Sequence, residues 1–274
     1  MFLKRYFILA LLLFQLSCGK SADTPAETKI PQRIVSLAPS LTEMLSYIGE
    51  GDRLAGVTTF CDYPPEVTNL PKVGGLSDFD IESVVSLKPD LVLAAWSGNP
   101  KDKVERLESL GIKVMVFSEN TAADILSNIS ILAGVFGKDP TLYLDPLKAR
   151  FAGVVQNDIP PTALVVISIK PIFSVSTQTF IGDILRLAGY ENSVKSPVAY
   201  PMLSDELLAS LDPDYIFAAD DFKGEQAYFD TLIHSLKLKS KVYYIDTDIL
   251  SRPGPRIADI LETLAGIAET EAEK

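Results

Sequence analysis

Side chains that bind metals or act as catalytic bases are scarce in this sequence of 274 residues. It contains a single histidine and two cysteines, Cys18 and Cys61. Two cysteines cannot form a cysteine-only zinc or iron–sulfur site, and one histidine excludes the multi-histidine clamps that bind zinc or manganese. We therefore expect no resident metal site.

Motifs of catalysis and of nucleotide binding are also missing. The sequence has neither the G-x-S-x-G motif of a nucleophilic serine nor the G-x-x-x-x-G-K-[ST] loop that cradles phosphate. The histidine, His234, lies in an amphipathic stretch, Glu225–Lys239, where a structural or exposed role is the simpler interpretation. We predict a protein that is not an enzyme and has no cofactor. A hydrolase or redox enzyme on a two-lobed α/β scaffold is the alternative from another class.

Positive charge is in deficit. There are 25 lysines and arginines against 36 aspartates and glutamates, which gives a net charge of −11. A nucleic-acid partner demands a basic surface, so this balance argues against one. Apolar residues make up 47% of the chain, enough for a substantial core.

No apolar run is long enough to cross a bilayer comfortably. The longest, Tyr6–Phe14, follows Lys4 and Arg5 close to the N-terminus. A basic start, a short apolar core and a small residue before a cut are the layout of a secretory signal peptide. We predict a signal peptide over residues 1–17 and an exported protein, periplasmic or on the cell surface.

The residues around Cys18 resemble the acylation site of bacterial lipoproteins. Gln15 departs from that pattern, which usually has leucine there, so cleavage without lipid is the alternative. Residues 18–32 are polar and contain prolines, which predicts a tether between a membrane anchor and the folded body. If Cys18 carries a lipid, Cys61 has no partner and the protein has no disulfide.

After the tether, short apolar runs alternate with longer amphipathic stretches, a pattern typical of βαβ units and a parallel sheet. The predicted strands are Arg33–Leu37, Leu54–Thr58, Leu91–Ala95, Lys113–Phe117, Ala163–Ile169, Tyr215–Ala219 and Lys241–Ile245. The predicted helices include Leu41–Ile48, Pro100–Leu110, Ala122–Phe136 and a final one from about Pro255 to Glu271.

An internal repeat indicates two related lobes. The segment Glu82–Ala95 aligns without a gap to Glu206–Ala219, and both read as a helix, a Pro-Asp turn and a buried strand ending in Ala-Ala. We predict an α/β fold of two doubly wound parallel-sheet lobes, over residues 33–137 and 160–274, with a ligand cleft between them. Residues 138–159 would form a connecting helix of about eighteen residues, with a length of about 27 Å. Asp139 would be its N-cap and Pro140 its first residue, and Pro146 should kink or break it.

Ligands of open α/β sheets bind beyond the carboxyl ends of the strands, so the residues after each strand are candidates for a pocket. Four of these are aromatic, which suits a large, flat, partly apolar ligand, and two are charged and could bind polar groups at its edge. The alternative is that Phe60 and Phe173 are core residues and that Asp248 and Arg252 form a surface ion pair. The candidates are Phe60, Trp96, Phe173, Tyr200, Asp248 and Arg252.

Glu82 and Glu206 occupy equivalent positions of the repeat, each two residues after a candidate N-cap. An acid in the first turn of a helix interacts favourably with the helix dipole, which is one explanation. One glutamate in each lobe also suits docking onto a symmetric partner. The sequence alone leaves both explanations open.

The chain resembles the cobalamin/iron–siderophore substrate-binding proteins of ABC importers, from about Arg33 to Ala268. The resemblance rests on four segments, Asp62-Tyr-Pro-Pro65, Leu87–Val92, Ser109–Met115 and Pro255-Arg-Ile257. The family fold has two α/β lobes joined by one long helix, with a ligand between the lobes and no covalent chemistry.

The resemblance implies a corrinoid pocket made of the six strand-end candidates named above. Phe60 stands where a tyrosine is found and Tyr200 where a tryptophan is found, so aromatic stacking survives. A further tryptophan position falls on Leu76, a departure that Phe79 could compensate.

The resemblance also implies the partners: a corrinoid, and an ABC permease dimer with its ATPase subunits, to whose arginines Glu82 and Glu206 would dock. The protein itself would be a monomer, attached to the membrane through a lipid on Cys18. A receptor for an iron–siderophore or for haem, on the same fold, is the alternative ligand class.

Overall fold

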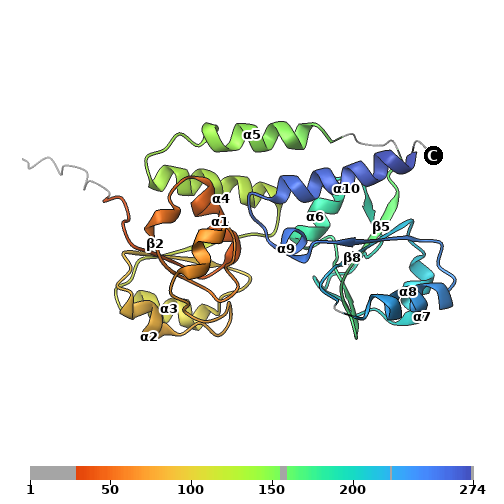
Figure 1. Ribbon diagram of the computed structural model, residues 1–274, viewed down its shortest axis with the longest axis horizontal. Coiled ribbons are helices and arrows are strands. Elements are labelled where there is room, and N and C mark those ends of the chain that lie inside the picture. The colour runs from red at the N-terminus through yellow and green to blue at the C-terminus, as the bar shows by residue number, and fades with distance from the viewer. Residues whose placement is uncertain (1–28, 155–158, 223, 273–274) are drawn as a thin grey trace, which may run out of the picture. The chain divides into compact units, whose positions relative to one another are not determined.

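Two separate β-sheets organise the chain (Figure 1). The computed structural model describes residues 29–154, 159–222 and 224–272. The first sheet has the order β2-β1-β3-β4, and every pair of neighbouring strands is parallel. Its strands are β1 (Ile34–Ser36), β2 (Leu54–Val57), β3 (Leu91–Ala95) and β4 (Val114–Phe117), all within one or two residues of their predicted bounds.

The second sheet has the order β6-β5-β8-β9, and a short strand, β7, also pairs with β5. The pairs of β5 with β7 and β8, and of β8 with β9, are parallel, as expected. The antiparallel β6 was not predicted; it folds straight back onto β5 and is too short to show a periodic pattern. The strands are β5 (Thr162–Ile169), β6 (Ile172–Ser174), β7 (Glu191–Asn192), β8 (Tyr215–Ala219) and β9 (Lys241–Ile245).

Helices cover both faces of the first sheet because alternate strand residues point to opposite faces (Figure 1). Val35 and Val92 pack with Val84 of α2 (Ile81–Ser86) and Leu107 of α3 (Lys101–Ser109). Their strand neighbours belong to a second apolar cluster, with α1 (Pro39–Tyr47) and α4 (Ala122–Val135). Two single-turn 3₁₀ helices, Gly51–Arg53 and Pro65–Asn69, complete this lobe.

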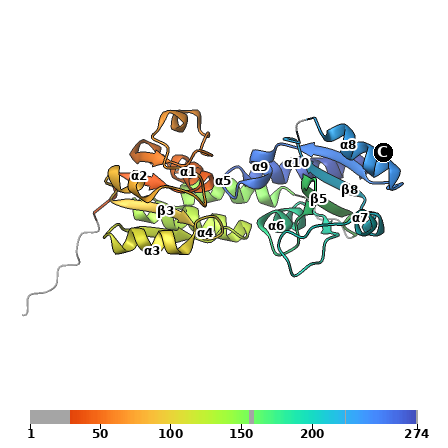
Figure 2. The same ribbon diagram turned by 90° about the horizontal axis from the view of Figure 1, so that it is seen from below.

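The second sheet is covered in the same way (Figures 1 and 2). Leu164 and Ile216 pack with Leu208 of α7 (Asp205–Leu211) and Phe229 of α8 (Gln226–Ser235). The opposite face packs against α6 (Phe180–Leu187) and α10 (Ile257–Ala272). A short helix, α9 (Thr247–Ser251), follows β9.

One apolar cluster continues from the first lobe into the second. It includes Leu41 of α1, Ile129 of α4, Leu147 of α5 (Thr141–Ala152), Ile184 of α6 and Leu261 of α10. Because apolar burial stabilises packing in proportion to the area removed from water, this shared core resists separation of the lobes. The lobes are therefore joined by a layer of helices as well as by the connecting segment.

The connecting helix α5 is shorter than predicted, with 12 residues, which at 1.5 Å per residue span about 18 Å. It begins at Thr141, whose backbone N–H donates to Oδ1 of Asp139 at 3.0 Å, and Pro140 stands at the N-cap position that was expected for Asp139. Gly153 ends the helix, and Pro146 lies inside it without dividing it. Residues 155–158 lie outside the described part of the chain.

The repeat has the same local geometry in both lobes. Asp80 caps α2 and Ser204 caps α7, each by accepting a hydrogen bond from the backbone N–H three residues on. The residues before the two Pro-Asp turns, Lys88 and Asp212, both have positive φ, 48° and 35°.

The aspartates of these turns each hold the start of a neighbouring strand. The carboxylate of Asp90 accepts from the backbone N–H of Arg33 at 3.0 Å, just before β1, and that of Asp214 accepts from the N–H of Thr162 at 2.8 Å, in β5. The Pro-Asp turn therefore has the same structural task in each lobe, and the related lobes inferred from the repeat are confirmed.

The predicted signal peptide, the acylation site at Cys18 and most of the tether lie outside the described residues. Cys61 is a buried free thiol that contacts the hydroxyls of Thr42 and Thr58 at 3.3 and 3.1 Å. Among the described helices, none combines the length and the apolar character that a membrane span requires.

Candidate functional site

A cleft of about 440 Å³ opens where the carboxyl ends of the strands in both sheets meet. From the first lobe it is lined by loops that follow all four strands, and from the second by three loops. The lining residues are Ala38, Pro39, Ser40, Phe60, Leu76, Ala95, Ser97, Gly98, Glu119, Asn120, Gln178, Thr179, Phe180, Ile181, Ala199, Tyr200, Asp248, Ser251, Arg252 and Pro253.

Four of the six predicted pocket residues line this cleft: Phe60, Tyr200, Asp248 and Arg252. The two aromatic side chains are 55% and 52% exposed, so they offer ring surface that a ligand could cover. The alternative that placed Phe60 in the core is therefore wrong.

The other two predicted residues, Trp96 and Phe173, are not among the lining residues. Trp96 stands in the chain between two residues that are, and its side chain is 68% exposed. Phe173 is half-buried on β6, where it forms a β-bridge with Met202. Phe180, at the start of α6, supplies an aromatic ring that the sequence analysis did not select.

Leu76 lines the cleft in the place where the resemblance implied a tryptophan. Phe79 does not compensate for it, because its ring is 1% exposed and lies in the core with the ammonium of Lys103 over it, 5.0 Å from the ring centre. The expectation about Phe79 was wrong, because its side chain packs into the apolar cluster of α2 and α3 and not into the cleft.

Asn99 holds the edge of the cleft together. Its side-chain amide donates to the carbonyls of Leu37 at 3.0 Å and Leu76 at 2.8 Å, and its Oδ1 accepts from the N–H of Ala95 at 2.7 Å. Three loops that line the cleft are thus tied to one buried side chain.

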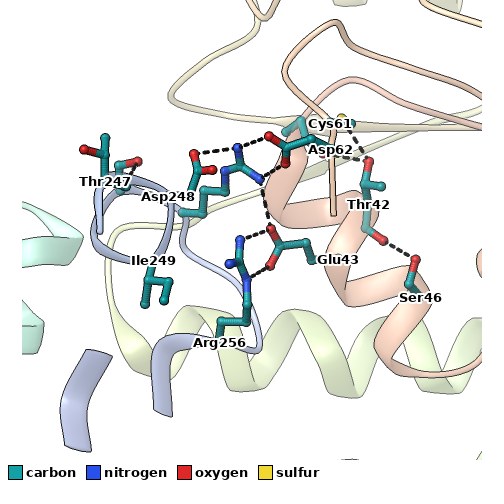
Figure 3. Close-up of polar contacts among 12 residues, drawn as sticks. Thr42, Glu43, Ser46, Cys61, Asp62, Thr247, Asp248, Ile249 and Arg256 are labelled. Atoms are coloured by element: carbon teal, nitrogen blue, oxygen red, sulfur yellow. Dashed lines mark hydrogen bonds and ion pairs between the residues drawn. The ribbon is translucent and has the colours of Figure 1, made fainter. Parts of the chain in front are cut away.

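The charged residues of the second lobe are bound to carboxylates of the first (Figure 3). The guanidinium of Arg252 donates to Oδ2 of Asp62 at 3.1 Å, to Oδ1 of Asp248 at 2.6 Å and to Oε1 of Glu43 at 3.4 Å. Its side chain is only 11% exposed, whereas those of Asp62 and Asp248 are 55% and 51% exposed, so a buried guanidinium contacts one buried carboxylate and two at the surface.

Glu43 is the centre of this network, with 3% of its surface exposed. Arg256 donates to both of its oxygens, at 2.9 and 2.7 Å, and also lies over the ring of Tyr63, 4.4 Å from the ring centre. Glu43 stands on α1 and its partners 209 and 213 residues later, so sequence reasoning could not pair them. Asp62 and Arg256 both lie in segments on which the family resemblance rests, but the sequence indicated no role for either residue.

The network shifts the ionisation of its members. The hydrogen bond from Arg252 lowers the pKa of the Asp62 carboxyl, assisted by the positive charges of Arg252 and Arg256 and opposed by burial. Burial alone would lower the pKa of Arg252, but the hydrogen bond with Asp62 and the charges of three carboxylates raise it overall. Asp62 and Arg252 therefore stay charged at neutral pH.

The cleft has no spare positive charge. Arg252 is the one cation among its described lining residues, and it is shared among three carboxylates. Glu119 adds a further carboxyl, 6% exposed, whose pKa burial raises to about 7. Within the described chain no cluster of histidine, cysteine, aspartate and glutamate side chains could hold a metal ion.

Glu82 and Glu206 lie outside the cleft, in the first turns of α2 and α7. Both side chains are exposed. The backbone N–H of Glu206 and a hydrogen bond with Ser204 lower the pKa of the Glu206 carboxyl. Glu82 and Glu206 thus occupy equivalent positions, and both side chains are accessible to a partner.

Comparison with known proteins agrees with this architecture. Residues 34–141 match the family model described as periplasmic binding protein. The vitamin B12-binding protein of Photorhabdus laumondii is 30% identical over 262 residues, 93% of each chain. The protein belongs to the periplasmic binding protein family. Its match to 93% of the length of that relative extends the family assignment across both lobes.

Other relatives of this binding protein carry related names. An uncharacterized ABC transporter substrate-binding lipoprotein, YvrC of Bacillus subtilis, is 31% identical and covers 86% of this chain and 80% of its own. The solved structure of the vitamin B12-binding protein BtuF of Vibrio cholerae superposes with a TM-score of 0.76 at 27% identity, over 89% and 99% of the two chains. A periplasmic heme-binding protein from Pseudomonas aeruginosa gives 0.74 at 26% identity, over 86% and 92%.

Proposed function

We propose that this protein captures cobalamin or a related corrinoid in the cleft between its lobes and delivers it to an ABC permease. It is a binding protein exported from the cytoplasm, and it performs no covalent chemistry on its ligand. The names of its relatives support this function, and the chemistry of the cleft supports it independently.

The proposal rests on two properties of the described cleft: aromatic side chains line it, and its one cation, Arg252, is already paired with carboxylates. The exposed rings of Phe60 and Tyr200 suit a large, partly apolar ring system. The neutral amides of Asn120 and Gln178 suit the amide groups at the edge of a corrin. A ligand with several carboxylates would find no free positive charge among these described residues.

Haem is the second candidate, because a heme-binding protein is among the structural relatives. Its propionates would be uncompensated in this cleft, for the same reason. Tyr200 is the one tyrosine among the described lining residues, and burial raises the pKa of its phenol. That disfavours the phenolate that would ligate haem iron, and no histidine lines the described cleft.

The test uses the single tryptophan of the chain as its reporter. Titrating the purified protein with cyanocobalamin should quench the fluorescence of Trp96 in a saturable way and release heat in a calorimeter. Haemin and an anionic ferric siderophore serve as comparison ligands, and a Trp96→Phe variant, followed by calorimetry, separates binding from the optical signal. No heat and no quenching at micromolar cyanocobalamin, with binding of haemin instead, would overturn the proposal in favour of the second candidate.

Delivery would use the two exposed glutamates. Glu82 and Glu206 stand at equivalent positions of the repeat, one in each lobe, which suits arginines on the two subunits of a permease dimer. In vesicles containing the cognate permease and its ATPase subunits, Glu82→Gln and Glu206→Gln should each reduce stimulation of ATP hydrolysis and the double variant should abolish it. Corrinoid affinity should not change, and the exposed Glu105→Gln on α3 is the matched control.

The membrane anchor remains part of the proposal. Cys18 would carry the lipid that keeps the protein near the permease, and Gln15 leaves cleavage without lipid as the other outcome. A mass measurement of the mature N-terminus distinguishes a diacylated cysteine from a free terminus.

A further inference from the structure

The loop between β4 and α4 brings a buried carboxyl, Glu119, to the wall of the cleft. Glu119 follows the carboxyl end of β4 by two residues and lines the cleft together with its neighbour Asn120. Only 6% of its surface is exposed, which is unusual for a glutamate without an ion-pair partner.

The backbone on both sides of Glu119 is fixed by other residues. The side-chain amide of Asn128 donates to the carbonyl of Ser118 at 2.7 Å, and the backbone N–H of Asn120 donates to Oδ2 of Asp124 at 2.9 Å. Thr121 and Asp124 form a capping box at the start of α4. The Glu119 side chain contributes to none of these hydrogen bonds, so the loop does not need it in order to fold.

The loop is also tied to the second lobe. The backbone N–H of Ala122 donates to Oδ2 of Asp183, on α6, at 2.9 Å. This contact joins two residues 61 positions apart in the sequence and ties the loop that carries Glu119 to the second lobe. The backbone at Glu119 is therefore held in place, while one oxygen of its side chain, Oε1, has no hydrogen bond among the described residues.

The carboxyl itself lacks a full set of partners. Its Oε1 is buried without any hydrogen bond among the described residues, a state that costs about 1–3 kcal/mol when a partner is missing. Burial raises its pKa to about 7, partly offset by a hydrogen bond with Ser40, and no charged side chain contributes. A buried polar atom that is left unpaired beside a ligand cleft suggests that the ligand provides the missing partner.

The charged groups on the elements around Glu119 already have partners of their own. Asp124 caps α4, and Asp183 accepts from Ala122 and forms an ion pair with Arg186 at 2.7 Å. Asp248 and Arg252, across the cleft, bind each other. None of them neutralises Glu119, so the protonated carboxyl, which can donate as well as accept, is the form that burial favours.

We propose that Glu119 determines ligand specificity, exchanging hydrogen bonds with an uncharged amide group of the ligand and excluding a ligand carboxylate from the floor of the cleft. This inference rests on the proposed function, since a corrinoid carries such amides around its ring. A carboxylic acid and a primary amide are complementary, because the acid O–H donates to the amide carbonyl while the amide N–H donates to the acid carbonyl.

Small movements of the side chain are enough for this contact. The last torsion of a glutamate is broad and roughly two-fold, so a rotation about it exchanges the two oxygens. Filling the cleft removes the remaining water from the carboxyl, which favours its protonated form further. Ligand binding should therefore take up a proton when the pH is near or above 7.

The experiment compares wild type with Glu119→Gln and Glu119→Leu by calorimetry at pH 6.0 and 8.0. The ligands are cyanocobalamin and its monocarboxylic acids, obtained by hydrolysis of single peripheral amides and tested one by one. Glu105→Gln, an exposed glutamate on α3, is the matched control, and thermal unfolding shows whether each variant is folded.

Wild-type affinity for cyanocobalamin should fall severalfold from pH 6.0 to 8.0, as the carboxyl loses its proton. Glu119→Gln should keep the affinity measured at pH 6.0 within about threefold and lose the pH dependence, because its amide donates at both pH values. Glu119→Leu should bind about tenfold more weakly, as expected for one lost hydrogen bond. At least one monocarboxylic acid should be rejected by wild type and accepted better by Glu119→Gln.

The two ideas fail in different ways. If wild type does not bind cyanocobalamin at all, the proposed function is wrong and this inference with it. If wild type binds, but both Glu119 variants match Glu105→Gln in affinity, pH dependence and rejection of the acids, the function stands and the role of Glu119 is refuted. Since glutamine has the same shape as glutamate, the comparison holds even if the leucine variant does not fold.

Discussion

Replacing Glu43 by glutamine is the sharpest test of the charge network that joins the lobes. Glu43 is 3% exposed and accepts hydrogen bonds from Arg252 and from both donor groups of Arg256. Glutamine keeps the shape but removes the negative charge and one of the two acceptors. Arg252 retains Asp62 and Asp248, whereas Arg256 loses its carboxylate partner and keeps one neutral amide acceptor and the ring of Tyr63.

The expected loss follows from the burial of these groups. Breaking a buried ion pair by removing one partner costs about 3–5 kcal/mol, and because 11% and 19% of the two arginine side chains are exposed, we expect the lower end. A loss of about 3 kcal/mol lowers the unfolding midpoint of a chain of this size by about 6–12 °C. Thermal and urea unfolding followed by circular dichroism measure this change.

Arg150 provides the matched control, because it also joins two helices by ion pairs. It binds Asp259 at 2.7 Å and Glu262 at 2.6 Å, but all three side chains are between 37% and 49% exposed. Arg150→Gln should cost about 1 kcal/mol or less, and added salt should shrink that loss while leaving the loss in Glu43→Gln nearly unchanged. If Glu43→Gln costs no more than Arg150→Gln, the reasoning from burial is refuted.

Three further predictions concern stability at acid pH, two glycines and the edge of the cleft. Because folding lowers the pKa of Asp62, the ionised carboxyl stabilises the folded state above the ordinary carboxyl pKa, and this stabilisation is lost as the pH falls through the lowered value. The difference in unfolding free energy between wild type and Asp62→Asn should therefore shrink between pH 5 and pH 2.5. A difference that stays constant over this range would contradict the prediction. Gly182→Ala should destabilise the protein by about 2 kcal/mol or more, since the new Cβ would lie 2.2 Å from the carbonyl oxygen of Ser176. Gly134→Ala, in α4 with open space around it, should stabilise the protein by about 0.5–1 kcal/mol. Equal effects of the two substitutions in thermal unfolding would refute this contrast. Asn99→Leu should lower the free energy of unfolding by about 2–3 kcal/mol and weaken cyanocobalamin binding, because three loop hydrogen bonds are lost. An unchanged calorimetric affinity would show that ligand binding does not depend on these hydrogen bonds.

Four of the six residues predicted for the pocket line the cleft, and the other two do not for a shared reason. Residues that follow parallel strands do gather at one edge of each sheet, so Phe60, Tyr200, Asp248 and Arg252 line the cleft as expected. The same rule does not give the direction of each side chain. Trp96 remains largely exposed, and Phe173 lies on a strand, β6, whose existence the sequence did not reveal.

The sequence by itself determined the parts of the protein that depend on local patterns. Short apolar runs between amphipathic stretches indicated seven of the nine strands found in the described chain, and a gapless match of fourteen residues revealed that the lobes are related. These features could be read directly because strand and helix periodicities, caps and Pro-Asp turns involve neighbours only a few residues apart.

Tertiary structure alone decided which groups are buried together. Glu43 meets Arg256 across 213 positions of sequence, and Glu119 differs from exposed glutamates such as Glu82 only in the loops and helices that close over it. Burial makes a carboxyl either an ion-pair partner or a group with a raised pKa, and burial is a property of the packed lobes. The two-lobed clamp could thus be predicted from the sequence, whereas the chemistry of its cleft required the structure.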